Sequence, residues 1–135
     1  MLDKKDLLLY AVTDRKCIGS RDFYETIENA LKGGVTILQL REKELSESQL
    51  VEEAVKVKDI CRRYNVPLII NDNYSAALKA GADGVHVGIE DAPVAEIRRI
   101  CGKNFIIGAT AKTVAQARQA EADGADYLGV GAVFP

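Results

Sequence analysis

Three polar side chains occupy alternate positions at the end of a β-rich run, at Gln39, Arg41 and Lys43. Successive side chains of a strand point to opposite faces, so these three would share one face of a sheet. Burying them there is costly unless each has a partner. A phosphate group is a suitable partner, because arginine binds it bidentately and lysine binds it as a point charge. The alternative is a solvated strand end with a salt bridge to Glu42 or Glu44.

Two aspartates follow the next two apolar runs of the chain. Asp72 comes directly after Asn71 at the end of one run, and Asp91 follows the other. Neighbouring strands lie about 4.8 Å apart, so the two carboxyl groups would reach the same edge of a sheet. Mg²⁺ takes one or two carboxylates together with phosphate oxygens and water. Beside Arg41 and Lys43, the two acids therefore indicate a Mg²⁺–pyrophosphate site. The alternatives are a turn at Asn71-Asp72 and a helix cap at Asp91.

Four other residues have two readings each. His86, the only histidine, is either a general base or a packed, hydrogen-bonded residue inside the fold. Thr110 either donates its hydroxyl to phosphate or is a helix N-cap or strand-end residue. Gly129 and Gly131 either let a ligand approach closely or make room for packing.

The elements that must position these residues alternate regularly between short β-rich runs and longer helical ones. We expect strands at residues 7–13, 36–41, 67–71, 85–88, 105–109 and 127–133. We expect helices at residues 22–31, 46–64, 74–80, 93–101 and 114–122. Strict alternation of this kind predicts parallel strands joined by crossover helices. Most of these strands are apolar on both faces, as expected when helices cover one face and a barrel interior lies on the other.

Local signals support several of these boundaries. Ser46 and Gln49 have the spacing of a capping box at the start of the long helix. Residues 81–88 resemble residues 124–131, and in each segment a glycine can end the preceding helix in the left-handed conformation.

An open doubly wound sheet and a closed barrel both fit this alternation. No glycine-rich dinucleotide fingerprint follows the first strand, which weakens the open-sheet reading. The polar residues come from the ends of several successive strands, as they do in (β/α)8 TIM barrels. Such a barrel needs at least about 200 residues. We therefore expect residues 1–135 to be a single incomplete TIM-barrel domain, the N-terminal portion with about six βα units.

Composition restricts the function classes. The net charge is −2 and no basic tract stands out, which excludes a nucleic-acid partner. No apolar run is long enough to span a membrane, and the N-terminus lacks the apolar segment of a signal peptide. Three widely spaced cysteines do not suggest a disulfide framework, so we expect a cytoplasmic location. The sequence leaves open whether the chain forms a homo-oligomer.

Five segments resemble those of one known family, thiamine-phosphate synthase. They are Tyr10-Ala11-Val12-Thr13-Asp14, Gln39-Leu40-Arg41-Glu42-Lys43, Asn71-Asp72, Gly81-Ala82-Asp83-Gly84-Val85-His86-Val87-Gly88 and Gly129-Val130-Gly131-Ala132-Val133-Phe134-Pro135. The resemblance implies a TIM barrel that uses Mg²⁺. It also implies a transferase of thiamine biosynthesis, which condenses hydroxymethylpyrimidine diphosphate with a thiazole phosphate or its carboxylated form. Pyrophosphate leaves first in this reaction, and the thiazole nitrogen then attacks the pyrimidine cation.

The resemblance also assigns roles to residues. Substrate binding falls to Gln39, Leu40, Arg41, Glu42, Lys43, Asn71 and Thr110. The catalytic residues would be Arg41, Lys43 and Thr110, with Thr110 in place of a serine. The Mg²⁺ ligands would be Asp72 and Asp91.

The sequence departs from the family pattern in three places. Ile89 stands where glutamine is usual, and Lys112 stands where histidine is common. The chain stops at Pro135, before the segments that bind thiazole phosphate, so we expect it to be inactive or nearly so by itself. The alternatives are a thiazole tautomerase of the same fold and a non-catalytic, phosphate-binding half-barrel.

Overall fold

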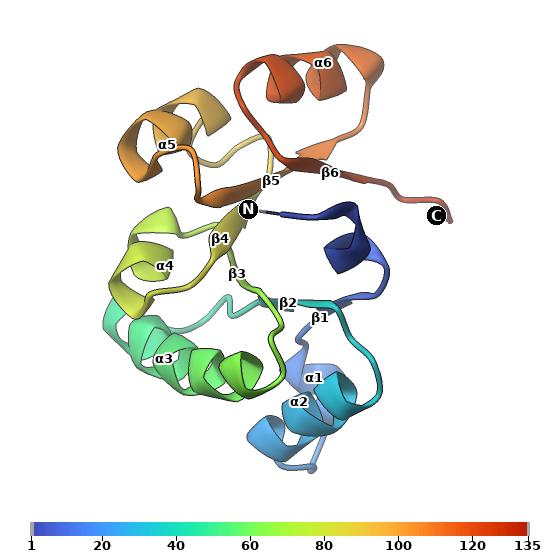
Figure 1. The fold of residues 1–135 in the computed structure, drawn as a ribbon, viewed down its shortest axis with the longest axis vertical. Coiled ribbons are helices and arrows are strands. Elements are labelled where there is room, and N and C mark those ends of the chain that lie inside the picture. Colours follow the sequence, from blue (N-terminus) through green and yellow to red (C-terminus); the bar gives the residue numbers. More distant parts are fainter. Residues whose placement is uncertain (1, 135) are drawn as a thin grey trace.

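The computed structural model describes residues 2–134. Six parallel strands pair in sequence order, β1-β2-β3-β4-β5-β6. Figure 1 shows that they form a curved sheet with the α-helices on its outer side. The strands are β1 (Tyr10–Val12), β2 (Ile37–Leu40), β3 (Leu68–Asn71), β4 (Gly84–Val87), β5 (Ile106–Ala111) and β6 (Tyr127–Val130). This arrangement confirms the predicted portion of a TIM barrel.

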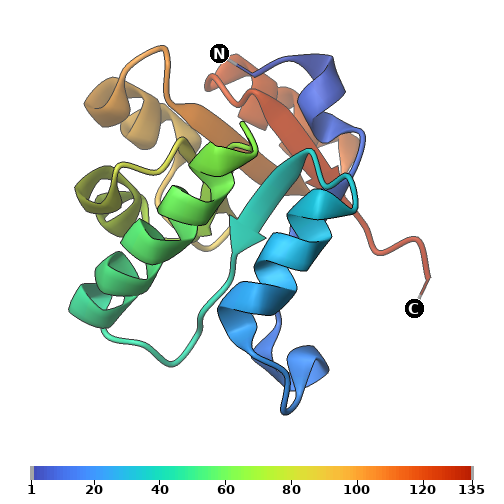
Figure 2. The ribbon, with the colours of Figure 1, turned by 60° about the horizontal axis from the view of Figure 1, so that its bottom comes forward.

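The helices alternate with these strands. They are the short 3₁₀ helix η1 (Lys4–Leu7) and the α-helices α1 (Arg15–Ile18), α2 (Phe23–Lys32), α3 (Glu47–Arg63), α4 (Tyr74–Ala80), α5 (Val94–Cys101) and α6 (Val114–Ala122). Figure 2 shows α2 and α3 side by side along the sheet. No helix in the described part of the chain is long and apolar enough to cross a bilayer.

Two short helices, η1 and α1, were not predicted. The expected first strand, at residues 7–13, is only three residues long, and η1 includes Leu7. Each of the two helices begins at an aspartate whose side chain accepts hydrogen bonds from free backbone amides. Asp3 forms a capping box with Asp6, and Asp14 accepts from the amides of Lys16 and Cys17. Apolar residues after Asp6 suggested a strand, but the local capping bonds favour a helical turn there.

The predicted helix boundaries are confirmed where their signals were strongest. Ser46 and Gln49 form the expected capping box at the start of α3. Gly81 ends α4 in the left-handed conformation, with φ of 70°. In the second copy of the motif the helix ends one residue earlier, at Asp123, and Gly124 follows with φ of 103°. Pro135 of the last quoted segment lies outside the described residues.

Side chains alternate across the sheet, as expected for strands covered on both faces. Leu38 and Leu40 are buried under the helices in the large outer core. Three isoleucines form a smaller apolar layer inside the curve, at Ile37, Ile69 and Ile106. Leu2, Leu7, Tyr10 and Tyr127 pack against that layer. The N-terminal segment therefore fills one end of the interior, as Figure 1 shows.

The repeated Gly-Ala-Asp motif has the same structural role in both copies. The carboxylate of Asp83 accepts the backbone amide of Leu68, at 2.8 Å, and pairs with Lys58 of α3. The carboxylate of Asp126 accepts the amide of Ile107, also at 2.8 Å, and pairs with Arg98 of α5. Each aspartate thus joins the start of its own strand to the preceding strand and to the helix before that.

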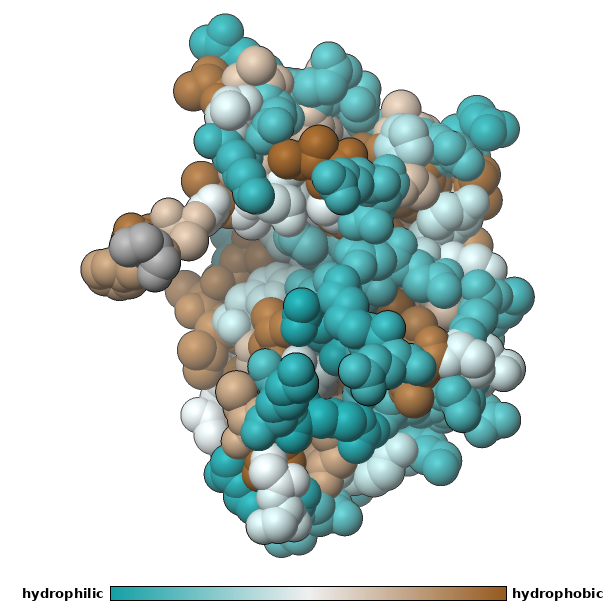
Figure 3. Space-filling model, turned by 180° about the vertical axis from the view of Figure 1, so that it is seen from behind, coloured by the Kyte–Doolittle hydropathy of each residue, from teal (hydrophilic) through white to brown (hydrophobic). Residues whose placement is uncertain are grey.

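Exposed apolar side chains gather on the two outer strands and the segments beside them. Within residues 2–134, β1 pairs only with β2, and β6 pairs only with β5. The large exposed side chains there are Leu8, Leu9, Val12, Leu128, Val130, Val133 and Phe134. Figure 3 shows hydrophobic residues gathered beside the C-terminal segment on this side of the molecule.

The Asp83 link predicts a stability effect. Asp83→Ala leaves the amide of fully buried Leu68 without a partner, so the free energy of unfolding should fall by about 1–3 kcal/mol. Urea denaturation measures the change. Asp59→Ala, at an exposed position of α3, is the matched control and should change stability by less than about 0.5 kcal/mol. Equal stability of the two variants would contradict the role of Asp83.

The three cysteines are free thiols, and their burial predicts their reactivity. Cys17 is exposed, Cys101 is half-buried and Cys61 is buried, where burial raises the pKa of its thiol to about 12. Since the thiolate is the reactive form, alkylation of the native protein should proceed in the order Cys17, Cys101, Cys61. Mass spectrometry of a time course gives the order. Rapid native labelling of Cys61 would show that the core around α3 is not packed as described.

Candidate functional site

A hollow of about 520 Å³ lies where strands β3, β4 and β5 end. Its polar lining includes Lys43, Asp72, Asp91, Thr110 and Lys112. Asp72 follows β3, Asp91 lies in the loop after β4, and Thr110 is near the end of β5. The structure therefore brings together four of the predicted site residues, and it adds Lys112, which sequence comparison had marked only as a departure.

Lys43 and Asp72 form an ion pair at one side of this hollow. The ammonium Nζ of Lys43 lies 2.6 Å from Oδ2 of Asp72. Asp72 has a φ of 64°, a left-handed conformation that aspartate adopts more readily than most residues. The alternative salt bridge within the segment, to Glu42 or Glu44, is wrong for the described residues, since Lys43 pairs with Asp72 and Glu42 pairs with Arg15 at 2.7 Å.

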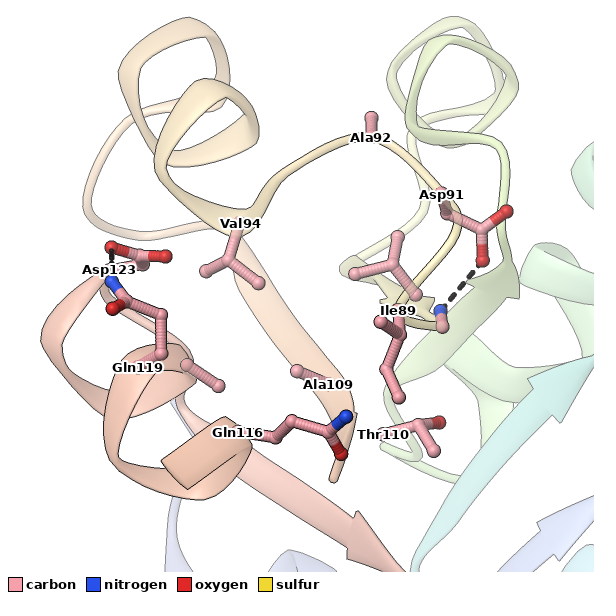
Figure 4. Close-up of a pocket in the computed structure, with 12 residues that line it drawn as sticks. Ile89, Asp91, Ala92, Val94, Ala109, Thr110, Gln116, Gln119 and Asp123 are labelled. Carbon is pink, nitrogen blue, oxygen red and sulfur yellow. Dashed lines mark hydrogen bonds between the residues drawn. The ribbon is translucent and has the colours of Figure 1, made fainter. Parts of the chain in front are cut away.

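Asp91 belongs to the loop after β4 and does not cap a helix. Its Oδ2 accepts the backbone amide of Gly88 at 2.7 Å, the bond drawn in Figure 4. Helix α5 begins with Pro93 at its cap and has no side-chain capping bond. Burial raises the pKa of the Asp91 carboxyl, and nearby Asp72 raises it further, while the bond from Gly88 lowers it. The two carboxyl groups therefore lie close enough to interact.

These two acids fit a hydrated Mg²⁺ ion that also binds a phosphate group. Two neighbouring carboxylates repel one another, and a divalent cation between them would relieve the repulsion. Among the described residues there is no cluster of three or more histidine, cysteine or acidic side chains that could hold a metal. Two carboxylate ligands are typical of Mg²⁺, which takes its other ligands from water and substrate phosphates.

Arg41 lies beside a neighbouring hollow of about 320 Å³, which Lys43 also lines. The prediction that Gln39, Arg41 and Lys43 share a strand face is wrong, because only Gln39 lies in the strand. Strand β2 ends at Leu40, so Arg41 and Lys43 belong to the following loop and strand alternation does not apply to them. The rest of the second hollow is lined by Asp14, Arg15, Lys16, Glu42 and Glu44.

In the 39–43 segment, the side chain of Leu40 is buried and that of Glu42 is already paired. Leu40 is fully buried in the outer core, so only its backbone could reach a ligand at the mouth. Glu42 is held by Arg15, whose guanidinium also pairs with Glu53 and lies 3.9 Å over the ring of Phe23. The sequence resemblance assigned both residues to substrate binding, and the geometry gives their side chains structural contacts.

Gln39 and Asn71 point into the interior of the curved sheet, below the hollow. Gln39 is only 6% exposed, and its Nε2 donates to the hydroxyl of Tyr10 at 2.8 Å. Asn71 donates to Oε1 of Gln39 at 3.0 Å. Hydrogen bonds to Tyr10 and Asn71 thus offset the cost of burying the Gln39 amide. Asn71 lies closer to the mouth than Gln39 and Tyr10 do.

His86 and Thr110 form a second interior pair. Nε2 of His86 lies 3.0 Å from the Thr110 hydroxyl, and Nδ1 lies 3.1 Å from that of Tyr127. Burial lowers the pKa of His86, against a smaller opposite effect of Asp72. The hydrogen-bonded reading of His86 is confirmed. The reading of Thr110 as a helix cap is wrong, because Thr113 caps α6.

A third hollow, of about 170 Å³, lies behind the Asp91 loop, and Figure 4 shows it. Ile89 lines both this hollow and the one that contains the acids, and it is 54% exposed. Tyr10 and Tyr127, which sequence reasoning did not single out, occupy the interior. Their inward positions follow from strand alternation, which was the one signal that could have found them.

Comparisons with known proteins identify the family of this chain. The chain matches the sequence model of thiamine monophosphate synthase over residues 9–135. It is 52% identical to the thiamine-phosphate synthase of Caldanaerobacter subterraneus subsp. tengcongensis and 51% identical to that of Clostridium acetobutylicum. Each alignment covers 96% of this chain, but only 60% and 61% of the relatives. The chain therefore spans about three fifths of the length of the curated relatives that it matches.

A solved structure is also similar. The thiamine phosphate pyrophosphorylase of Pyrococcus furiosus superposes with a TM-score of 0.89 at 37% identity. The superposition covers 97% of this chain and 63% of that protein. Sequence and fold thus agree, and the chain belongs to the thiamine monophosphate synthase family.

Proposed function

We propose that this chain binds the diphosphate of 4-amino-2-methyl-5-hydroxymethylpyrimidine diphosphate, with Mg²⁺, in the synthesis of thiamine phosphate. The other substrate would be a thiazole phosphate, and the second product would be pyrophosphate. The observation that carries the proposal is one hollow lined by three carboxylates (Asp72, Glu90 and Asp91), two lysines and a threonine hydroxyl. The names of the relatives, all thiamine-phosphate synthases, support the same reaction.

The residues of the hollow suit a reaction in which pyrophosphate departs. Negative charge builds on the leaving group, and preorganised cations and hydroxyl donors stabilise it. Lys43 and Lys112 would supply positive charge, and Thr110 would supply a hydroxyl. Asp72 and Asp91 would hold Mg²⁺, which acts as a Lewis acid on the same oxygens when bound.

The second chemical step needs no strong base on the protein. The attacking thiazole nitrogen carries a lone pair and has no proton to lose, so holding it near the pyrimidine cation is the main requirement. The tautomerase alternative instead requires a group that transfers protons. Both ring nitrogens of His86 are already hydrogen bonded, which does not favour that alternative.

The metal assignment predicts a coupled effect of Mg²⁺ and pyrophosphate. In calorimetry, Mg²⁺ should strengthen pyrophosphate binding to this chain. Asp72→Asn should abolish that enhancement, because one carboxylate is lost, but it should retain Mg²⁺-independent binding, because Lys43 is released from its ion pair. Asp59→Asn is the control and should behave as the unchanged chain. An undiminished Mg²⁺ effect in Asp72→Asn would remove Asp72 from the metal site.

The positions of the two basic residues predict unequal contributions. Lys43 lines the hollow that contains both acids, whereas Arg41 lines only the neighbouring one. Lys43→Ala should therefore weaken Mg²⁺–pyrophosphate binding by about tenfold, and Arg41→Ala by less. Lys103→Ala, at an exposed loop position, is the control. A larger loss for Arg41→Ala would place the diphosphate in the neighbouring hollow.

A further inference from the structure

A continuous chain of hydrogen bonds crosses the interior of the curved sheet. It joins one side chain from each of the six strands and ends at the mouth. Its members, in order, are Asn71, Gln39, Tyr10, Tyr127, His86 and Thr110. The successive distances are 3.0, 2.8, 2.6, 3.1 and 3.0 Å. All five contacts have hydrogen-bond lengths, so the groups act as one connected network.

The direction of each hydrogen bond in this network can be argued by counting the donors and acceptors of its members. Gln39 donates to the Tyr10 oxygen, so the single Tyr10 proton is free to go to Tyr127. If Tyr127 accepts it, the Tyr127 proton goes to Nδ1 of His86. A neutral imidazole that accepts at Nδ1 carries its proton on Nε2, which donates to Thr110. The Thr110 oxygen accepts this bond, and its own proton remains free to point into the hollow.

Packing holds the central members of the network in place. A Cβ at Gly108 would lie 2.1 Å from Cζ of Tyr127, so only glycine leaves room for that ring. A Cβ at Gly129 would lie 3.1 Å from Cε1 of His86, which confirms the packing reading of Gly129. The rings of Tyr10 and His86 lie 5.6 and 5.5 Å from that of Tyr127. Burial raises the pKa of both tyrosines, so each hydroxyl keeps its proton.

We propose that Tyr10, Tyr127 and His86 are positioning residues that order the Thr110 hydroxyl as a donor to a diphosphate oxygen. This inference rests on the proposed function for the identity of the anion. The reverse order, with Thr110 donating to His86, would direct an oxygen lone pair into the hollow and oppose an anion there. A charge-assisted bond from Thr110 to phosphate favours the first order.

The tautomer of His86 tests the order without any ligand. His86 is the only histidine, so ¹⁵N-histidine labelling of the 135-residue chain gives the signals of one ring. We expect the proton on Nε2, and a hydroxyl proton that correlates with Nδ1 across the hydrogen bond. That correlation should vanish in Tyr127→Phe and persist in Tyr24→Phe, a tyrosine outside the network. A proton on Nδ1 of the unchanged chain would overturn the proposal.

Pyrophosphate with Mg²⁺ tests the donor role. Thr110→Val should weaken binding by about tenfold, and Thr110→Ser should restore it, because serine keeps the hydroxyl. The hydroxyl of Tyr127 bonds His86, which in turn bonds Thr110 in the hollow. Tyr127→Phe should therefore weaken binding by about threefold. Unchanged affinity in Tyr127→Phe, with Tyr24→Phe as its match, would contradict the positioning role.

The two measurements separate this inference from the proposed function. If the unchanged chain bound no pyrophosphate in the presence of Mg²⁺, the proposed function would fail. The tautomer of His86 would still decide the order of the hydrogen bonds, since it is read without ligand. If pyrophosphate bound well but the proton lay on Nδ1, the function would stand and the ordering would fall.

Discussion

Polar side chains inside the curved sheet are tolerated only because each has a hydrogen-bond partner there. This constraint divides the interior into levels along the strands. Ile37, Ile69 and Ile106 form an apolar layer at one end, where the N-terminal segment packs. The paired amides and hydroxyls come next, and charged groups line the hollow at the mouth. The charged site thus stands on a neutral and fully paired support.

Much of the fold could be predicted because its signals are local. Alternating apolar runs defined the strands, and the Ser46 capping box and Gly81 marked helix ends correctly. The short helices η1 and α1 escaped prediction because their capping aspartates lie within apolar or basic surroundings that give no periodic pattern. The end of β2 at Leu40 also escaped, since Arg41 continues the alternation of the sequence although the backbone has left the sheet.

The same distinction applies to the site. Asp72, Asp91 and Thr110 could be placed together because the carboxyl ends of adjacent parallel strands must meet at one edge. Arg41 could not be placed, since a loop sets its direction. The contact between Tyr10 and Tyr127 joins residues 117 positions apart, and no local pattern encodes it. Aromatic residues in strands are ordinarily read as core, so their hydroxyls became visible only in three dimensions.

The Asp83 and Asp126 links divide much of the chain into two similar modules, α3-β3-α4-β4 and α5-β5-α6-β6. Each module is tied internally by one carboxylate that joins two strands and a basic residue of its first helix. The loop that carries Ile89 and Asp91 connects the two modules and takes part in neither the Asp83 link nor the Asp126 link. Evolution can therefore alter that loop, and with it the ligand preferences of the mouth, without loosening the scaffold.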